Sequence, residues 1–176
     1  MCISGCDDPK KPSSSGAKKP CAAPDPKQKA IDDAIAIIEK SKWSKTPEGK
    51  KVLAKIKQLR KDGKIEYKKL PGGTLGQWSG DKILIPDGAT DPDFIASSVL
   101  VHEGTHALNE DEFPKSKTKF TIDEEVRTNT NELDLYEEQR TTGYRSAELE
   151  RRRNARKKGK LRDDVRSRYP GLPEQL

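Results

Sequence analysis

Two histidines and a glutamate in the middle of the chain have the spacing of metal ligands and a general base. Residues 102–106 form an H-E-x-x-H motif, and His102 and His106 are the only histidines among the 176 residues. Residues four apart on a helix lie one above the other, so these two side chains can share one metal ion. Zinc lowers the pKa of a bound water towards ~7, and the adjacent Glu103 can take that proton and pass it to a leaving amine. The motif therefore predicts a zinc-dependent hydrolase.

The segment around the motif is expected to be a buried central helix. Asp91 is a good N-cap, Pro92 suits the first helical position, and Asp93 favours the helix N-terminus. From Phe94 to Leu108 the segment is apolar over most of its circumference. Polar side chains in a buried helix need strong partners, and a metal ion supplies them. The alternative is a helix with two structural histidines.

A third ligand is needed, because a catalytic zinc usually has three protein ligands and a water. No histidine remains, so a carboxylate or a cysteine must serve. Residues 121–140 predict a second helix, and Glu125 falls at the edge of its apolar stripe, whereas Glu124 points towards solvent. Glu125 is therefore the predicted ligand, and Glu132 is a reserve ligand or a partner that holds a histidine N–H. The stripe consists of Ile122, Val126, Leu133 and Tyr136.

The motif together with Glu125 in a following helix resembles the gluzincin-type zinc metallopeptidases. Within that group the chain is most similar to the small metallopeptidase toxin and effector domains of bacterial polymorphic toxin and secretion systems. The resemblance covers residues 72–140. It implies an α+β, zincin-like fold in which a small antiparallel sheet packs on helices around a central HExxH helix. It also implies Zn²⁺ as cofactor, a peptide or protein substrate, and an immunity protein or the secretion apparatus as a partner.

Relatives in this group often add a tyrosine, histidine or arginine that stabilises the oxyanion of the transition state. In this chain the resemblance leaves three candidates for that role. They are Tyr136, Tyr144 and Arg127.

Residues 74–86 resemble the substrate-binding hairpin of the same domains. Residues 75–78 and 82–85 predict two strands around a turn at residues 79–81. The resemblance implies that Gly76, Gln77 and Trp78 form an edge strand to which an extended peptide adds. The alternative is a sheet that only covers the helices.

Composition and local patterns predict one folded domain with a segment at either end. Only 31% of the residues are hydrophobic and 36% are charged, which indicates a small core and long solvated segments. Residues 1–26 are rich in Pro, Ser and Lys and are expected to be disordered or a linker. We expect a single metallopeptidase domain over residues 27–165, beginning with helices at residues 27–43 and 47–62, and a C-terminal tail over residues 166–176.

The N-terminal residues and the hydropathy pattern bear on localisation. No apolar run approaches 18 residues, which excludes a spanning helix of ordinary length. The charged and apolar regions of a signal peptide are also absent, so we expect a protein made in the cytoplasm, with delivery to a target cell by a secretion system as a further expectation. Cys2, Cys6 and Cys21 are interpreted as surface thiols, and the alternatives are a small disulfide loop that leaves one cysteine unpaired or a cysteine-only metal site.

A basic run near the C-terminus supports a second hypothesis. The net charge is +6, and residues 151–160 contain seven basic residues. Such a run could bind nucleic acid, with the histidines structural, but aromatic residues that stack on bases are missing, so a solvated helix face is expected. A third hypothesis is a zinc hydrolase that cleaves a non-protein amide, such as a cell-wall crosslink.

Overall fold

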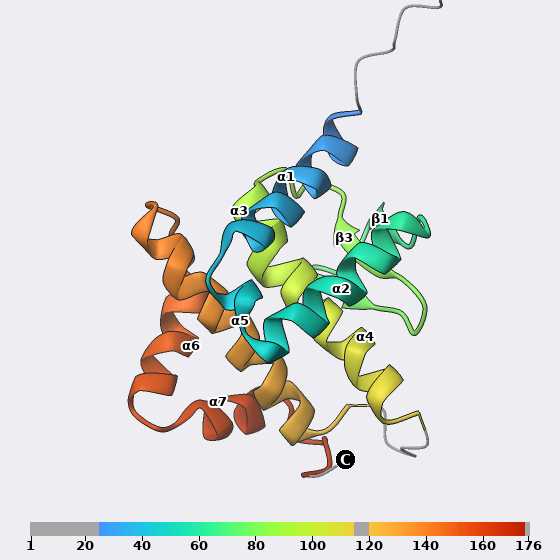
Figure 1. Cartoon of the computed structure of the whole chain (residues 1–176). Coiled ribbons are helices and arrows are strands. Elements are labelled where there is room, and N and C mark those ends of the chain that lie inside the picture. The colour runs from blue at the N-terminus through green and yellow to red at the C-terminus, as the bar shows by residue number, and fades with distance from the viewer. Residues whose placement is uncertain (1–24, 115–119, 175–176) are drawn as a thin grey trace, which may run out of the picture.

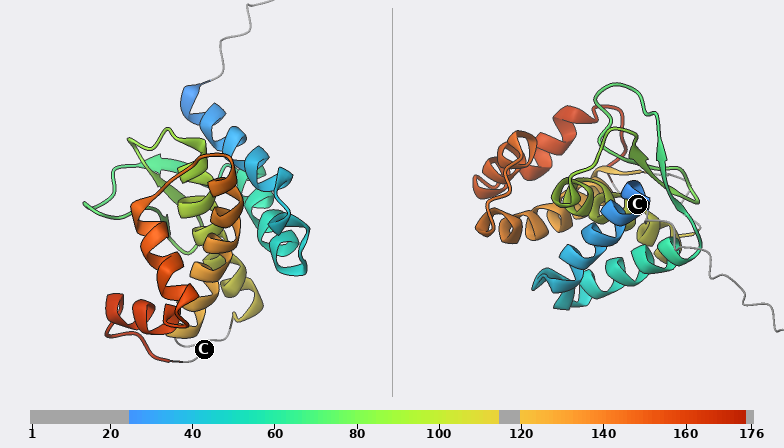
Figure 2. Two further views of the ribbon diagram at one scale, coloured as in Figure 1. Left: turned by 90° about the vertical axis from the view of Figure 1, so that its left-hand side faces the viewer. Right: turned by 90° about the horizontal axis from the view of Figure 1, so that it is seen from above.

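Helices surround a central helical segment, and a small sheet lies at one side of the molecule (Figure 1). The structure is a computed structural model that describes residues 25–114 and 120–174. Two further views show α6 and α7 stacked beside α5, on a different side of the central segment from α1 and α2 (Figure 2). The elements in chain order are α1 (Pro26–Lys40), η1 (Trp43–Lys45), α2 (Pro47–Lys61), β1 (Ile65–Lys68), β2 (Gln77–Trp78), β3 (Ile83–Pro86), α3 (Pro92–Phe94), η2 (Ile95–Val101), α4 (His102–Glu112), α5 (Ile122–Thr141), α6 (Ala147–Lys157) and α7 (Leu161–Arg168).

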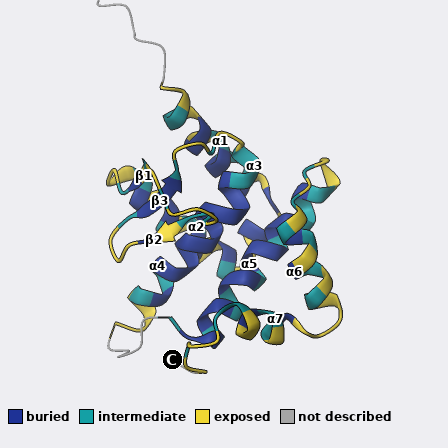
Figure 3. Cartoon of the chain, turned by 180° about the vertical axis from the view of Figure 1, so that it is seen from behind, coloured by how far each residue is buried: buried dark blue, intermediate teal, exposed yellow. Residues whose placement is uncertain are grey.

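The central segment consists of α3, η2 and α4, which follow one another without a break. Asp91 caps it as predicted, because its side chain accepts a hydrogen bond from the Asp93 N–H, and Pro92 takes the first position. Every residue of η2 is buried, and buried residues are concentrated in the middle of the molecule (Figure 3). The expected burial is confirmed, but η2 is a π-helix rather than an α-helix. Hydrophobic periodicity could not reveal this difference, because a segment buried on all sides has no polar face to mark its winding.

The helices α1 and α2 cover the central segment, near the ranges predicted for them. Their N-terminal caps are Asp25 and Thr46, whose side chains accept hydrogen bonds from main-chain N–H groups of the first turn. The helix α2 approaches α4 closely at Gly104. A Cβ atom at this position would lie 2.7 Å from Cγ1 of Ile56, so glycine permits the contact.

The sheet has three strands in the order β1-β3-β2. The predicted hairpin is confirmed, because β2 pairs antiparallel with β3. The expectation of an antiparallel sheet is wrong, because β1 pairs parallel with β3 and the sheet is mixed. The connection after β1 carries the chain to the far edge before the hairpin reverses it, so β3 returns to the middle in the direction of β1. The fold is α+β, and β2 is an edge strand.

The C-terminal helices pack on α5 around a second, small cluster of buried side chains. This cluster consists of Leu133, Tyr136, Leu149 and Leu161, with Tyr144 packed against it. The boundary predicted at residue 166 falls inside α7. Beyond that helix, the main-chain carbonyls of Pro173 and Glu174 accept hydrogen bonds from the N–H groups of Ile122 and Asp123. These main-chain hydrogen bonds therefore hold the end of the described chain against the first turn of α5.

Two further expectations concern the N-terminal segment and a membrane-spanning helix. Residues 1–24, with Cys2, Cys6 and Cys21, lie outside the described residues, so the expectation for that segment stays a prediction. No helix within residues 25–114 and 120–174 combines the length and the apolar character that crossing a bilayer requires.

Candidate metal centre

The structure brings His102, His106 and Glu125 together. The two histidines lie one turn apart on α4, and Glu125 faces them from the first turns of α5. Nε2 of His106 lies 3.4 Å from Oε1 of Glu125, and Nε2 of His102 lies 4.0 Å from its Oε2. One ligand atom from each residue falls within 4.8 Å of the others. These three side chains form a group that could hold a metal ion.

The opposite ring nitrogen of each histidine is held by a buried carboxylate. Nδ1 of His106 lies 2.7 Å from Oε1 of Glu124, and Nδ1 of His102 lies 3.2 Å from Oε2 of Glu132. Because a carboxylate only accepts, each Nδ1 carries the hydrogen, and Nε2 is left to face Glu125. Metal-ligating histidines generally have such a partner, so the donor set fits a bound metal ion. Of the two roles considered for Glu132, the structure shows the contact with a histidine.

The expectation that Glu124 points to solvent is wrong. Its exposed fraction is 5%, and it lies in the first turn of α5, where Thr121 caps the helix by accepting a hydrogen bond from the Glu124 N–H. Helical phase assumes that one side of a helix meets solvent. Here α4 packs against the side of this turn that carries Glu124, so this carboxylate contacts His106 and does not reach solvent.

The electrostatics of the group favour a positive charge between the carboxylates. Burial opposes the charged form of His106, but the hydrogen bonds with Glu124 and Glu125 raise its pKa to about 10. Burial also opposes the ionisation of Glu125, yet the contacts with His106 and His102 keep its pKa below the usual value. A cation of higher charge than a proton, bound at the same atoms, would be stabilised electrostatically by the same carboxylates.

Glu103 lies beside this group and is held by the edge strand. The Trp78 N–H donates a hydrogen bond of 2.7 Å to Oε2 of Glu103. Burial is the main cause that raises the pKa of Glu103 above its usual value, and the neighbouring histidines oppose it. The strand passes so close that a Cβ at Gly76 would lie 2.9 Å from Cγ1 of Val99 and 3.1 Å from Oε1 of Glu103. Any larger residue at this point would press on Val99 and on the carboxylate of Glu103.

A cavity of about 800 Å³ opens in front of the candidate metal ligands. Residues 73–78, which include the predicted substrate strand Gly76, Gln77 and Trp78, form one wall. The ring of Phe120 lies edge-on to His106, with a centroid distance of 5.1 Å. The remaining wall comes from α6 and from the end of α7.

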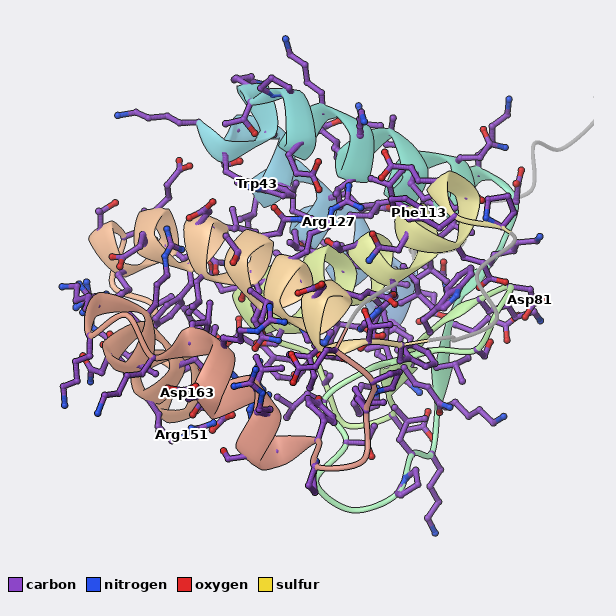
Figure 4. The ribbon with its side chains drawn as sticks, turned by 90° about the horizontal axis from the view of Figure 1, so that it is seen from below. Trp43, Asp81, Phe113, Arg127, Arg151 and Asp163 are labelled. Carbon is purple, nitrogen blue, oxygen red and sulfur yellow. The ribbon has the colours of Figure 1, made fainter. Side chains whose placement is uncertain are left out.

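The three candidates for oxyanion stabilisation do not line this cavity. Tyr136 is buried in the cluster between α5 and α6, with Tyr144 packed edge-on to it at 5.8 Å. Arg127 lies between α2, α4 and α5 (Figure 4), where it pairs with Glu48 and Glu112. The resemblance supplied only the residue types for this role, and the structure places all three side chains outside the cavity.

The residues of the cavity wall that were not predicted include Arg152, Arg168 and Tyr169. Arg152 belongs to the basic run interpreted as a solvated helix face, yet its exposed fraction is 6%. Arg168 and Tyr169 belong to the expected C-terminal tail. Burial, with a smaller effect of Glu125, raises the pKa of Tyr169. No local pattern marks these residues, because contacts with residues of α5 that are distant in the sequence bring α6 and the end of α7 to the site.

Comparison with known proteins adds no family. No protein-family model matches the chain, and neither a curated protein nor a solved structure matches it.

Proposed function

We propose that this chain is a zinc-dependent metallopeptidase with a zincin-like, gluzincin-type site. The observation that carries the proposal is the convergence of His102, His106 and Glu125 beside Glu103, in a cavity walled by an edge strand. Two nitrogen ligands and one carboxylate form a ligand set used by zinc enzymes that keep one position open.

Zinc bound there would activate a water molecule and polarise the substrate carbonyl. Glu103 is the general base that takes the proton of the attacking water, and it later returns a proton to the leaving amine. The Trp78 N–H fixes the orientation of its carboxylate, because it occupies one of the two oxygens. Burial also suits Glu103 to this role, because a raised pKa brings the carboxylate closer to neutral pH as a base.

The edge strand β2 is the proposed binding site for the substrate main chain. It lies at the border of the sheet, and residues 73–78 line the cavity. An extended peptide that adds to this edge satisfies main-chain groups and leaves sequence selection to the cavity walls. Gln77 is exposed on this strand, and the missing side chain of the preceding Gly76 lets the chain lie close to Glu103.

Tyr169 is the proposed donor to the oxyanion, in place of the residues expected from the sequence. It is the tyrosine that lines the cavity among the described residues. Its raised pKa keeps the phenol protonated at neutral pH, so that it can donate a hydrogen bond.

Delivery as a bacterial toxin or effector, with an immunity protein as partner, is proposed on the resemblance of the motif region alone. Expression of the wild-type chain inside bacterial cells should then slow growth, whereas expression of Glu103→Gln should not. Equal growth with both proteins would contradict this proposal.

Most of the positive charges on which the nucleic-acid hypothesis depends are paired with carboxylates in the structure. Four arginines of the basic run pair with carboxylates of α5 or α7. Among the described residues, Lys157, Lys158 and Lys160 remain without an ion pair. A zinc amidase that acts on cell-wall crosslinks uses the same site chemistry, and only the substrate distinguishes it.

Zinc content and peptide cleavage test the proposal. The purified full chain should contain one zinc, cleave peptides, lose both properties on chelation and regain them when zinc is added. Glu125→Ala should lose zinc and cleavage together. Glu137→Ala, an exposed glutamate on the same helix, should keep both. Zinc retained at full occupancy by Glu125→Ala would contradict the ligand set, and cleavage of cell-wall amides without cleavage of peptides would favour the amidase.

A further inference from the structure

A buried arginine on α6 contacts the carboxylate that holds His102. Nη1 of Arg152 donates a hydrogen bond of 2.6 Å to Oε2 of Glu132, and the same oxygen lies 3.2 Å from Nδ1 of His102. Glu132 has an exposed fraction of 0%, and Arg152 is 6% exposed. Three buried groups from α4, α5 and α6 therefore form one continuous chain that ends at a candidate metal ligand.

Both contacts of Glu132 meet at one oxygen. Its other oxygen, Oε1, has no hydrogen-bond partner within residues 25–114 and 120–174. Without the guanidinium, a fully buried carboxylate would keep only an imidazole N–H as partner, and an ionised group in that condition is strongly disfavoured. It would become protonated or move, and in either case its hold on His102 would change.

Arg152 is itself fixed at its other side. Nε of Arg152 donates a hydrogen bond of 2.8 Å to Oε1 of Glu148, one turn earlier on α6. The guanidinium is thus held between Glu148 and Glu132, and it lines the same cavity as the candidate ligands. Arg152 is therefore fixed by two carboxylates and is not a solvated surface charge.

We propose that Arg152 is a positioning residue that acts through Glu132 to fix the ring of His102 for metal binding. The inference rests on the proposed metal site and adds a requirement to it, because the docking of α6 becomes a condition of full metal affinity. Arg152, which belongs to the basic run, then supports the metal site and does not bind an external partner.

Zinc affinity measured by competition with a chromophoric chelator tests this inference on the full chain. Arg152→Met should weaken zinc binding by up to about 10- to 100-fold, because it disturbs Glu132, and loss of such a partner of a metal-ligating histidine usually has an effect of this size. Arg152→Lys keeps a charge near Glu132 and should recover part of the loss. The matched control is Arg151→Met, because Arg151 is the next residue on α6 and also pairs with Glu148, but its side chain is 46% exposed. This control should leave zinc affinity unchanged.

A double-mutant cycle separates positioning from general packing. If Arg152 acts through Glu132, then Arg152→Met should cost little further zinc affinity in a Glu132→Gln background. The absorption bands of bound Co²⁺ should shift in Arg152→Met and stay as in wild type in Arg151→Met. If Arg152→Met does not fold, the same comparison is made with Arg152→Lys and Glu132→Gln.

The inference is overturned if zinc affinity is unchanged in folded Arg152 variants, or if Arg152→Met weakens it equally with Glu132 and with Gln at that position. Affinity is read without a substrate. A wild-type protein that binds zinc tightly but cleaves no peptide would therefore contradict the proposed function and leave this result standing. A wild-type protein without zinc affinity would overturn both.

Discussion

Nδ1 of His106 lies 2.7 Å from Oε1 of Glu124, and both side chains are buried. Glu124 is the third residue of α5, three positions after the Thr121 cap. A glutamate at this position often reaches back to the N-terminus of its own helix. Here its carboxylate crosses to α4 instead, so the first turn of α5 holds both a candidate metal ligand, Glu125, and the support of another.

This contact predicts that Glu124→Ala weakens the site and the fold. The imidazole N–H would lose its acceptor, and a buried unpaired donor costs about 1–3 kcal/mol of unfolding free energy. Zinc affinity should fall by about 10- to 100-fold. Chemical denaturation and zinc titration measure the two effects.

Asp123→Ala is the matched control for this prediction. Asp123 is the neighbouring residue, and its ion pair with Arg162 is exposed, so its removal should cost at most about 1 kcal/mol. If Glu124→Ala behaves like this control in both measurements, the contact with His106 has no role in holding the metal.

The raised pKa of His106 predicts that zinc binding releases a proton. The metal-free site keeps His106 protonated up to about pH 10, so a metal ion at Nε2 must displace a proton. Zinc affinity should therefore fall as the pH is lowered, with release of about one proton per zinc near neutral pH. Calorimetry in buffers of different ionisation enthalpy counts this proton, and an enthalpy independent of buffer would contradict the prediction.

The raised pKa of His106 also makes the stability of the metal-free protein depend on pH. A folded-state pKa above the ordinary value of 6.5 contributes stability that is fully present below pH 6.5. This contribution is lost as the pH rises towards about 10. The free energy of unfolding attributable to His106 should therefore decrease over that interval, and addition of zinc should remove the dependence.

Much of the fold and the motif could be predicted because the signals are local. The cap at Asp91, Pro92 at the first helical position and the turn of the hairpin all depend on residues a few positions apart. The same is true of His102 and His106, whose alignment follows from helical spacing alone. These features reappear in the structure at the expected places.

The rest depends on contacts between distant segments. The parallel pairing of β1 with β3, the burial of Glu124 and the approach of Tyr169 each need an element from elsewhere in the chain. Helical phase selected Glu125 correctly as a neighbour of the histidines, because it placed Glu125 at the edge of the apolar stripe. It failed for Glu124, which sits where more than one segment encloses the helix.

Gly76→Ala should reduce activity while leaving the zinc ligands in place. The added methyl group would press on Val99 and on the carboxylate of Glu103, so the base should be displaced. A misplacement of about 1 Å at a reacting group can cost on the order of 10²-fold in rate. Steady-state kinetics with zinc content as a check measure the effect.

Gly72→Ala provides the comparison for this prediction. A Cβ at Gly72 meets no atom within 4 Å, so this variant should retain wild-type kinetics. Normal kinetics in Gly76→Ala would show that the edge strand does not constrain Glu103.

Tyr169→Phe should lower kcat and leave zinc content unchanged. Removal of one donor to an oxyanion typically costs about 10²–10³ in kcat. Tyr144→Phe, at a tyrosine packed away from the cavity, should have wild-type kcat. If the two variants are equally active, Tyr169 does not contact the oxyanion and another group takes that role.

The most direct test of the central claim compares wild type and Glu103→Gln, each loaded with zinc, in the cleavage of the same peptide. Glutamine keeps the size of the side chain but cannot accept the proton. We predict one zinc per chain in both proteins and a rate at least ~10²-fold lower in the variant, the low end of the general acid–base contribution. Equal rates at equal zinc occupancy would contradict the assignment of Glu103 as the base and the mechanism built on it.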